Sequence, residues 1–196
     1  MNYEEVKKHV EVLLHKLSDD LTYHDAEHTL RDVLSVSVHL AKNIKIEKED
    51  LILLKTAVLF HDLGYLKQYD DNEAIGASMA EEVLPQYGYN HEQVVVIKGL
   101  ILATKLPQTP STLLEKIICD ADLDSLHRTD FLTQGEKLKH EISIYKNGVN
   151  DDEWLNIQLL FLKNHTYFTD VDLELRNKGK LMNISLLESR LGNSVL

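Results

Sequence analysis

The sequence contains few of the residues that interrupt or cross-link a chain. Of its 196 residues, 8 are Gly, 3 are Pro and one is Cys. A lone cysteine, Cys119, excludes an intrachain disulfide and favours a reducing compartment, so we expect a cytoplasmic protein. The scarcity of Gly and Pro leaves long periodic segments intact, which favours helices over a sheet of short strands. No tract rich in Gly, Ser or Pro marks a boundary between two domains.

Basic residues and long apolar runs are also scarce. The 21 Lys and Arg are outnumbered by 32 Asp and Glu, which gives a net charge of −11. This charge repels polyanions, so we expect no non-specific binding to nucleic acids. The longest apolar stretch, near Leu51 to Phe60, is interrupted by Lys55 and is too short to span a bilayer. We therefore expect no membrane association, and a phosphate substrate would need a local positive charge such as a metal ion.

Apolar residues recur at helical spacing through most of the chain. This periodicity predicts an all-α fold, a helical bundle of about nine helices that forms a single domain over residues 1–196. We expect Thr22 to cap the second helix, Gly64 to end the third, and Thr112 with Glu115 to form a capping box for the sixth. The expected helices cover about residues 3–17, 22–41, 48–63, 72–85, 91–103, 112–122, 130–145, 151–164 and 170–191.

Four polar residues are expected to face the interior from three different helices. His61 continues the apolar stripe of its helix and Asp62 follows it directly, while Asp122 continues the stripe of another helix. An unpaired buried carboxylate is so costly that it is neutralised or binds a cation. Histidine and aspartate are ligands for divalent metals. We therefore expect one divalent ion to be held by His28, His61, Asp62 and Asp122.

Three motifs occur in order: YHDAEHT at residues 23–29, VLFHDLGY at 58–65 and IICDADL at 117–123. Together they resemble the motifs of the HD-domain superfamily, and the resemblance covers about residues 21–126. It implies a helical bundle around one or two divalent ions and hydrolysis of phosphate mono- or diesters, often of nucleotides. A set of two histidines and two aspartates suits Mn, Fe, Ni, Zn, Co or Mg. Residues 127–196 are expected to complete the bundle, and they are also candidates for a homodimer contact.

The resemblance assigns the metal ligands to His28, His61, Asp62 and Asp122. Because the sequence CDAD offers two carboxylates, Asp120 is an alternative ligand to Asp122. We prefer Asp122, which continues an apolar stripe and precedes Leu123 as in the family. The phosphodiesterases of this superfamily have a further histidine soon after the HD pair that helps to bridge a second metal. This chain has none there, so we expect a single ion.

The YHxxxH element also resembles the start of the cyclic-nucleotide phosphodiesterase motif, in which the first histidine protonates the leaving group. By that match His24 is the general acid; the alternative is a surface imidazole or one that supports a ligand. Asp62 or Asp122 is expected to help to orient or deprotonate a water molecule. Glu73, Thr104 and Lys105 are candidates for the substrate pocket, with Lys105 facing phosphate.

These residues predict a metal-dependent phosphohydrolase. The expected reaction is hydrolysis of a phosphate mono- or diester, of a nucleotide or another small molecule, by water that a metal ion activates. The alternative is a non-catalytic sensor that binds a metal or a nucleotide and signals through its C-terminal helices.

Overall fold

In the computed structural model, which describes residues 1–193, the chain forms nine α-helices and no strand. The all-α prediction is therefore confirmed for the described part of the chain. Residues 194–196 of the predicted single domain lie outside that part, and the domain assignment stays a prediction. The helices are α1 (Tyr3–Leu14), α2 (Leu34–Ile44), α3 (Lys48–Phe60), α4 (Asn72–Val83), α5 (His91–Ala103), α6 (Leu113–Asp122), α7 (Phe131–Tyr145), α8 (Asp151–Asn164) and α9 (Asp170–Asn193).

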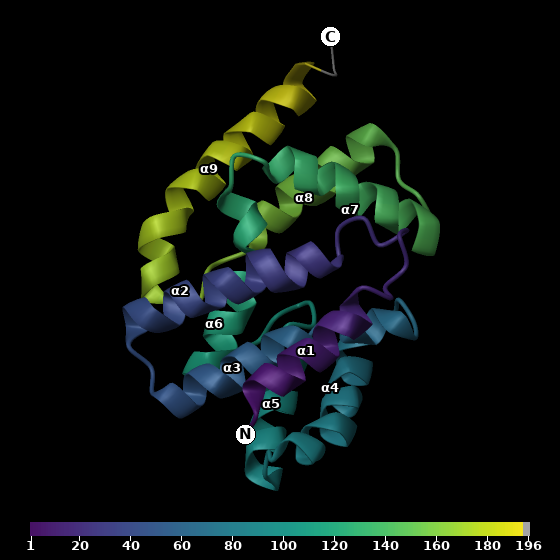
Figure 1. Ribbon diagram of the computed structural model, residues 1–196. Helices are drawn as coiled ribbons and strands as arrows, with labels where there is room; N and C mark the ends of the chain where they lie inside the picture. The colour runs from purple at the N-terminus through teal and green to yellow at the C-terminus, as the bar shows by residue number, and fades with distance from the viewer. Residues whose placement is uncertain (194–196) are drawn as a thin grey trace.

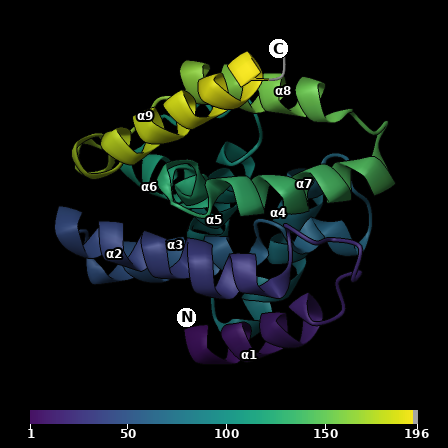
Figure 2. The ribbon, with the colours of Figure 1, turned by 90° about the horizontal axis from the view of Figure 1, so that it is seen from above.

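The first and last helices lie on opposite sides of the molecule. Figures 1 and 2 show α1 on one side, α9 on the other, and α2, α3 and α6 between them. Helices α8 and α9 pack against each other, and α9 also packs against a short 3-10 helix at Asp124–His127. The C-terminal third of the chain therefore rests directly on the segment that follows α6.

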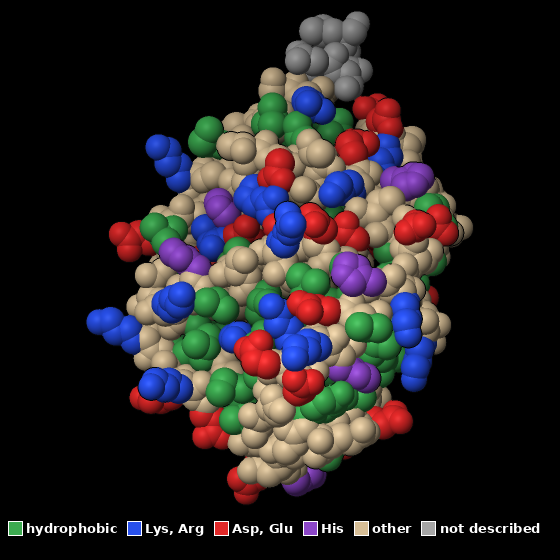
Figure 3. All heavy atoms as spheres, in the orientation of Figure 1, with side chains coloured by type: hydrophobic (Ala, Val, Ile, Leu, Met, Phe, Trp, Pro, Cys, Tyr) green, Lys and Arg blue, Asp and Glu red, His purple; other side chains and the backbone are tan. Residues whose placement is uncertain are grey.

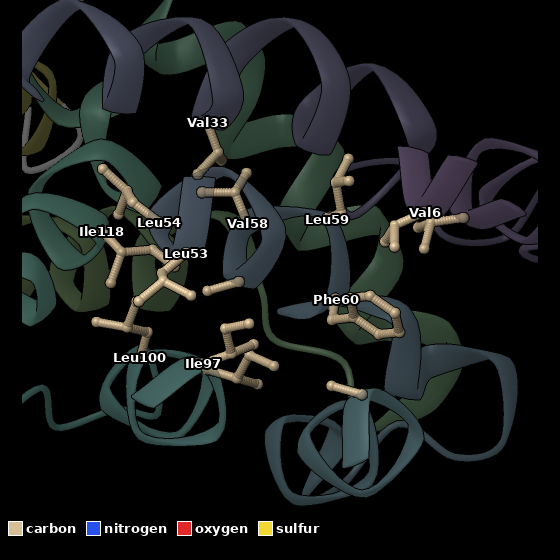
Figure 4. Packing of buried hydrophobic residues seen from close by; sticks show 14 of the residues in the cluster. Val6, Val33, Leu53, Leu54, Val58, Leu59, Phe60, Ile97, Leu100 and Ile118 are labelled. Carbon is tan, nitrogen blue, oxygen red and sulfur yellow. The ribbon is translucent and has the colours of Figure 1, made fainter. Parts of the chain in front are cut away.

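Helix α3 is the centre of the larger hydrophobic core. Its residues Val58, Leu59 and Phe60 are consecutive and all completely buried, which requires neighbours on every side of the helix. Figure 4 shows these three side chains together with Ile97 of α5 and Ile118 of α6. Each fully buried side chain of this size contributes roughly 1.5–3 kcal/mol to folding. Because the core surrounds the end of α3, the residues that follow this helix are placed in the interior.

A second, smaller hydrophobic cluster joins the C-terminal helices. Its four buried members are Leu126, Phe131, Leu162 and Leu187. The buried Asn183 of α9 holds the helix in place, because its Nδ2 donates to Leu126 O at 2.9 Å and to Arg128 O at 3.0 Å. Helices α7, α8 and α9 thus pack around a core of their own that adjoins the end of α6.

Charged side chains of both signs are interspersed with apolar ones on the face shown in Figure 3. Within residues 1–193, none of the helices combines the length and the apolar character needed to cross a membrane.

The prediction that a helix opens at Thr22 is wrong. Helical structure begins at Ala26, where Asp25 Oδ1 accepts a hydrogen bond from His28 N at 2.8 Å. The hydroxyl of Thr22 instead donates to Lys137 O at 2.8 Å. Aspartate and threonine are both good N-terminal caps, and a contact with a distant helix decides which of them is available.

The prediction that Gly64 terminates α3 is also wrong. Helix α3 ends at Phe60, and Gly64 lies in the 3-10 helix Leu63–Leu66. A Cβ atom at Gly64 would lie 1.9 Å from the carbonyl oxygen of Asn72. Glycine is required here because the start of α4 approaches the backbone closely, and no left-handed turn is involved.

Candidate metal centre

Three separate elements bring the predicted ligands into the interior. His28 opens a π-helix at His28–Val33, His61 and Asp62 directly follow α3, and Asp122 is the last residue of α6. The π-helix is seen in the bond from Leu34 N to Thr29 O, five residues back. Such wide turns change the direction in which side chains point and are frequent at functional sites. His28, the first residue of this π-helix, is buried, with 6% of its surface exposed.

The side-chain atoms of these residues lie close to one point. The ligand atoms of His28, His61 and Asp122 are all within 4.8 Å of one another. Asp122 Oδ1 is 3.4 Å from His28 Nε2 and 3.5 Å from His61 Nε2. Asp62 Oδ2 is 3.6 Å and 3.1 Å from the same two nitrogens. Adjacent ligands of a six-coordinate ion with bonds near 2.1 Å are about 3.0 Å apart, so these spacings suit a divalent metal.

The hydrogen bonding of the cluster fits a metal as well. His28 Nε2, His61 Nε2 and Asp62 Oδ2 are buried and have no hydrogen-bond partner. Unpaired buried polar atoms are costly, so three of them around one point need an explanation. His61 Nδ1 is 2.7 Å from Val58 O, which makes Nδ1 a protonated nitrogen and leaves Nε2 as the nitrogen of this ring that can bind a metal. A bond of this kind on the far nitrogen is typical of metal-binding histidines.

Two neutral amides orient the carboxylates. Asn72 Nδ2 donates to Asp62 Oδ1, and Gln108 Nε2 donates to Asp122 Oδ2, each at 3.4 Å. Each amide engages one carboxylate oxygen and leaves the other toward the imidazoles. Neither amide was expected from the sequence, because Asn72 opens its own helix and Gln108 lies in a loop, without a periodic signal.

Asp120, the alternative ligand, has another task. It is completely buried, and its two oxygens accept hydrogen bonds from Phe168 N (2.8 Å), Thr169 N (2.8 Å) and Thr169 Oγ1 (2.7 Å). Three donors from the segment before α9 thus saturate this carboxylate. The geometry supports the preference for Asp122 over Asp120.

The electrostatics of the cluster favour a cation. Burial raises the pKa of Asp62, but the charges of His61 and His24 outweigh it and the pKa lies below its ordinary value. Burial also raises the pKa of Asp122, but its close contacts with His28 and His61 outweigh burial and bring the pKa below its ordinary value. Burial lowers the pKa of His61, but Asp62 and Asp122 raise it well above its ordinary value. Two ionised carboxylates in a buried site attract positive charge.

His24, the predicted general acid, lies beside the cluster. Its ring is 5.8 Å from the ring of His28 and 4.7 Å from that of Tyr65, measured between centroids. Its Nδ1 is 2.5 Å from Oε1 of Glu141, a fully buried residue of α7 that was not expected from the sequence. Burial lowers the pKa of His24, whereas Asp62 and Glu141 raise it above its ordinary value overall.

The three predicted substrate-binding residues occupy different surroundings. Lys105 is exposed and forms an ion pair with Asp71. Glu73 is half-buried, and burial raises its pKa, with a further contribution from the charge of Asp62. Thr104 is 5% exposed, and its hydroxyl donates to Ile101 O at 2.8 Å. The placement of Thr104 therefore gives no support to a role in a substrate pocket.

Comparison with solved structures shows the same architecture elsewhere. A predicted HD superfamily hydrolase from an uncultured Thermotogales bacterium is 19% identical, with a TM-score of 0.64 over 95% of this chain and 91% of that one. Bacillus subtilis YpgQ, solved in complex with ADP, is also 19% identical, with a TM-score of 0.63 over 96% and 97%. At this identity the likeness shows the fold.

Comparison by sequence matches a smaller part of the chain than comparison by structure. No curated protein matches the chain. The model of the HD domain matches residues 25–126, a range that begins one residue after His24, ends before Glu141 and contains the four predicted ligands. With the motifs, the geometry and this match in agreement, the chain belongs to the HD domain family.

Proposed function

We propose that this chain is a metal-dependent phosphohydrolase that uses one divalent ion held by His28, His61, Asp62 and Asp122. The observation that carries the proposal is the group of three buried atoms without a hydrogen-bond partner, which come from two elements and meet the oxygen of Asp122 from a third. A cation between them satisfies all three atoms at once. Without a cation, these atoms have only the imidazole–carboxylate contacts of 3.1–3.6 Å to offset the cost of burial.

The residues around the proposed metal site can each carry out a different step of hydrolysis. A bound divalent ion supplies Lewis-acid chemistry, which makes water a better nucleophile at neutral pH and offsets phosphate charge. Asp62 or Asp122 orients the attacking water and accepts its proton. As the new P–O bond forms, the bond to the leaving oxygen breaks and that oxygen keeps the electron pair. His24, whose raised pKa favours the protonated form, donates a proton to the leaving oxygen.

The proposed substrate is a small-molecule phosphate ester, in the first place a nucleotide. The solved complex of YpgQ with ADP shows that a protein of this fold binds a nucleotide. With a net charge of −11, this chain must meet a phosphate with local positive charge, and Lys105 together with a bound ion can provide it. The lone cysteine, Cys119, fits an enzyme of the cytoplasm.

A panel of nucleotides and phosphodiesters, assayed with manganese, cobalt, nickel, zinc and magnesium, tests the proposal. His61→Ala and Asp62→Ala should each lose the metal, measured by elemental analysis, and turnover together. His91→Ala, which removes an exposed histidine at the start of α5, is the matched control and should keep both. Undiminished turnover in metal-free protein would refute the mechanism. Metal and nucleotide binding without any turnover would instead identify a sensor.

A further inference from the structure

Glu141 is a buried carboxylate outside the part of the chain that matches the family. It lies on α7, has no exposed surface, and follows His24 by 117 residues in sequence. An isolated buried carboxylate is costly, so the partners of Glu141 indicate what it does. Burial raises its pKa, but its hydrogen bonds with His24 bring the pKa below its ordinary value. Glu141 is therefore an ionised acceptor.

Each oxygen of Glu141 contacts two groups. Oε2 accepts from the backbone N–H of Tyr23 at 3.0 Å and of His24 at 3.1 Å. Oε1 accepts from the hydroxyl of Tyr69 at 3.0 Å and lies 2.5 Å from His24 Nδ1. Since an ionised carboxylate can only accept, His24 Nδ1 must carry a proton. The backbone and the ring of His24 are thus held by the same side chain.

This arrangement decides which nitrogen of His24 is available. With Nδ1 bonded to Glu141, only Nε2 can reach a substrate. We propose that Glu141 is a positioning residue for the reaction: it fixes the ring of His24 and the proton on Nδ1, so that Nε2 faces the leaving oxygen. The inference rests on the proposed phosphohydrolase function. It also makes α7, from outside the matched residues, a part of the active site.

Glu141→Gln is a sharp test because of the donors around the side chain. An amide NH₂ cannot face the two backbone N–H groups, so the amide oxygen must take the place of Oε2. The NH₂ then faces His24 Nδ1 and forces that nitrogen to accept, so the ring holds a single proton, on Nε2, and cannot become the imidazolium that serves as the general acid. Glu136→Gln removes an exposed carboxylate from the same helix and is the matched control.

Substrates with different leaving groups distinguish a positioning role of Glu141 from a purely structural one. A p-nitrophenolate leaves without a proton, whereas phenolate benefits from a general acid. We expect Glu141→Gln to lower kcat for phenyl phosphate, or for thymidine 5′-(phenyl phosphate), by about 100-fold. The corresponding p-nitrophenyl esters should change by less than about threefold, on the same principle, and manganese content should not change. Adding His24→Asn to Glu141→Gln should cost no further activity, because both changes remove one function.

The outcomes distinguish the two proposals. If the wild-type protein hydrolyses none of the four esters with manganese, the proposed function fails and the role of Glu141 fails with it. Turnover in which Glu141→Gln affects phenyl and p-nitrophenyl esters equally, or adds to the loss from His24→Asn, refutes the role of Glu141 alone. Should Glu141→Gln not fold, nitrogen NMR of the magnesium- or zinc-loaded wild type decides: Nδ1 of His24 must be protonated, and an unprotonated Nδ1 overturns the inference.

Discussion

Asn72 shows how a neutral side chain can control a metal site that it does not enter. Its amide holds one oxygen of Asp62, so the other oxygen stays turned toward His28 and His61. Removal of such a supporting partner typically lowers metal affinity about 10- to 100-fold. We expect this loss for Asn72→Ala in calorimetric titration with manganese.

The matched control for this prediction is Asn43→Ala. Asn43 is exposed on α2, where its amide lies 2.9 Å from the ring of His39. The control should bind manganese as the wild type does. An affinity for Asn72→Ala equal to that of the control would show that Asp62 needs no support from Asn72.

The sequence identifies residues of the site best where their own helix carries the signal. His61 and Asp122 continue the apolar stripes of α3 and α6, and both stripes pack into the larger hydrophobic core. Gln108 and Glu141 have no comparable signal. Gln108 lies in a loop, and Glu141 meets His24 across 117 residues. Helical periodicity predicts which face is buried, but it does not predict which distant residue lies opposite.

At the scale of the elements, two glycines lead to opposite expectations. Gly64 faces the backbone of Asn72, and an added Cβ would lie 1.9 Å from its carbonyl oxygen. Gly99 lies within α5, where an added Cβ would meet only Glu115 Oε1, at 3.8 Å. Gly64→Ala should therefore lower the free energy of unfolding by about 3 kcal/mol, since backbone must move. Gly99→Ala should raise it by about 0.5–1 kcal/mol, because alanine favours the helix.

Urea unfolding of both variants, followed by circular dichroism, measures these changes. Gly64→Ala should also weaken manganese binding, because the displaced Asn72 no longer supports Asp62. Gly99→Ala should leave manganese binding as it is. A wild-type stability for Gly64→Ala would contradict the close approach of α4 to the segment after α3.

Helix boundaries were predictable where the signal is local. The capping box of Thr112 and Glu115 is confirmed, and it involves residues three positions apart. The start of the second helix was not predictable in the same way. The hydroxyl of Thr22 donates to the carbonyl oxygen of Lys137 on α7. The π-helix that begins at His28 does not follow the periodicity by which α-helices are predicted. At Thr22 a contact between elements overrides the local preference.

At the scale of the whole molecule, the end of α6 connects the metal centre with the C-terminal helices. Asp122 faces the two histidines, while Asp120 binds the backbone before α9 and Asp124 forms an ion pair with Arg176 of α9. These three aspartates, each two residues from the next, thus contact different partners. The C-terminal helices are therefore fixed relative to the metal ligand by direct bonds, in addition to the hydrophobic cluster around Leu126.

The stability of this C-terminal part should depend on pH through His165. Its ring lies between Phe161 and Tyr167, at centroid distances of 6.2 Å and 4.7 Å, and both ring nitrogens are buried without a hydrogen-bond partner. Burial and, to a smaller extent, the charge of Lys180 together lower the pKa of His165 from 6.5 to about 4. The folded protein therefore holds the imidazole in its neutral form.

The lowered pKa sets the sign of the effect. The stability that depends on neutral His165 is complete above pH 6.5, the ordinary pKa, and is lost as the pH falls toward 4. With allowance for partial exposure, the loss amounts to about 2 kcal/mol. His165→Phe keeps an aromatic ring between Phe161 and Tyr167 but cannot be protonated. Relative to wild type, the variant should become progressively more stable between pH 7 and pH 4.5 in urea unfolding. A difference between the two proteins that is the same at both pH values would show that His165 is not the group that titrates.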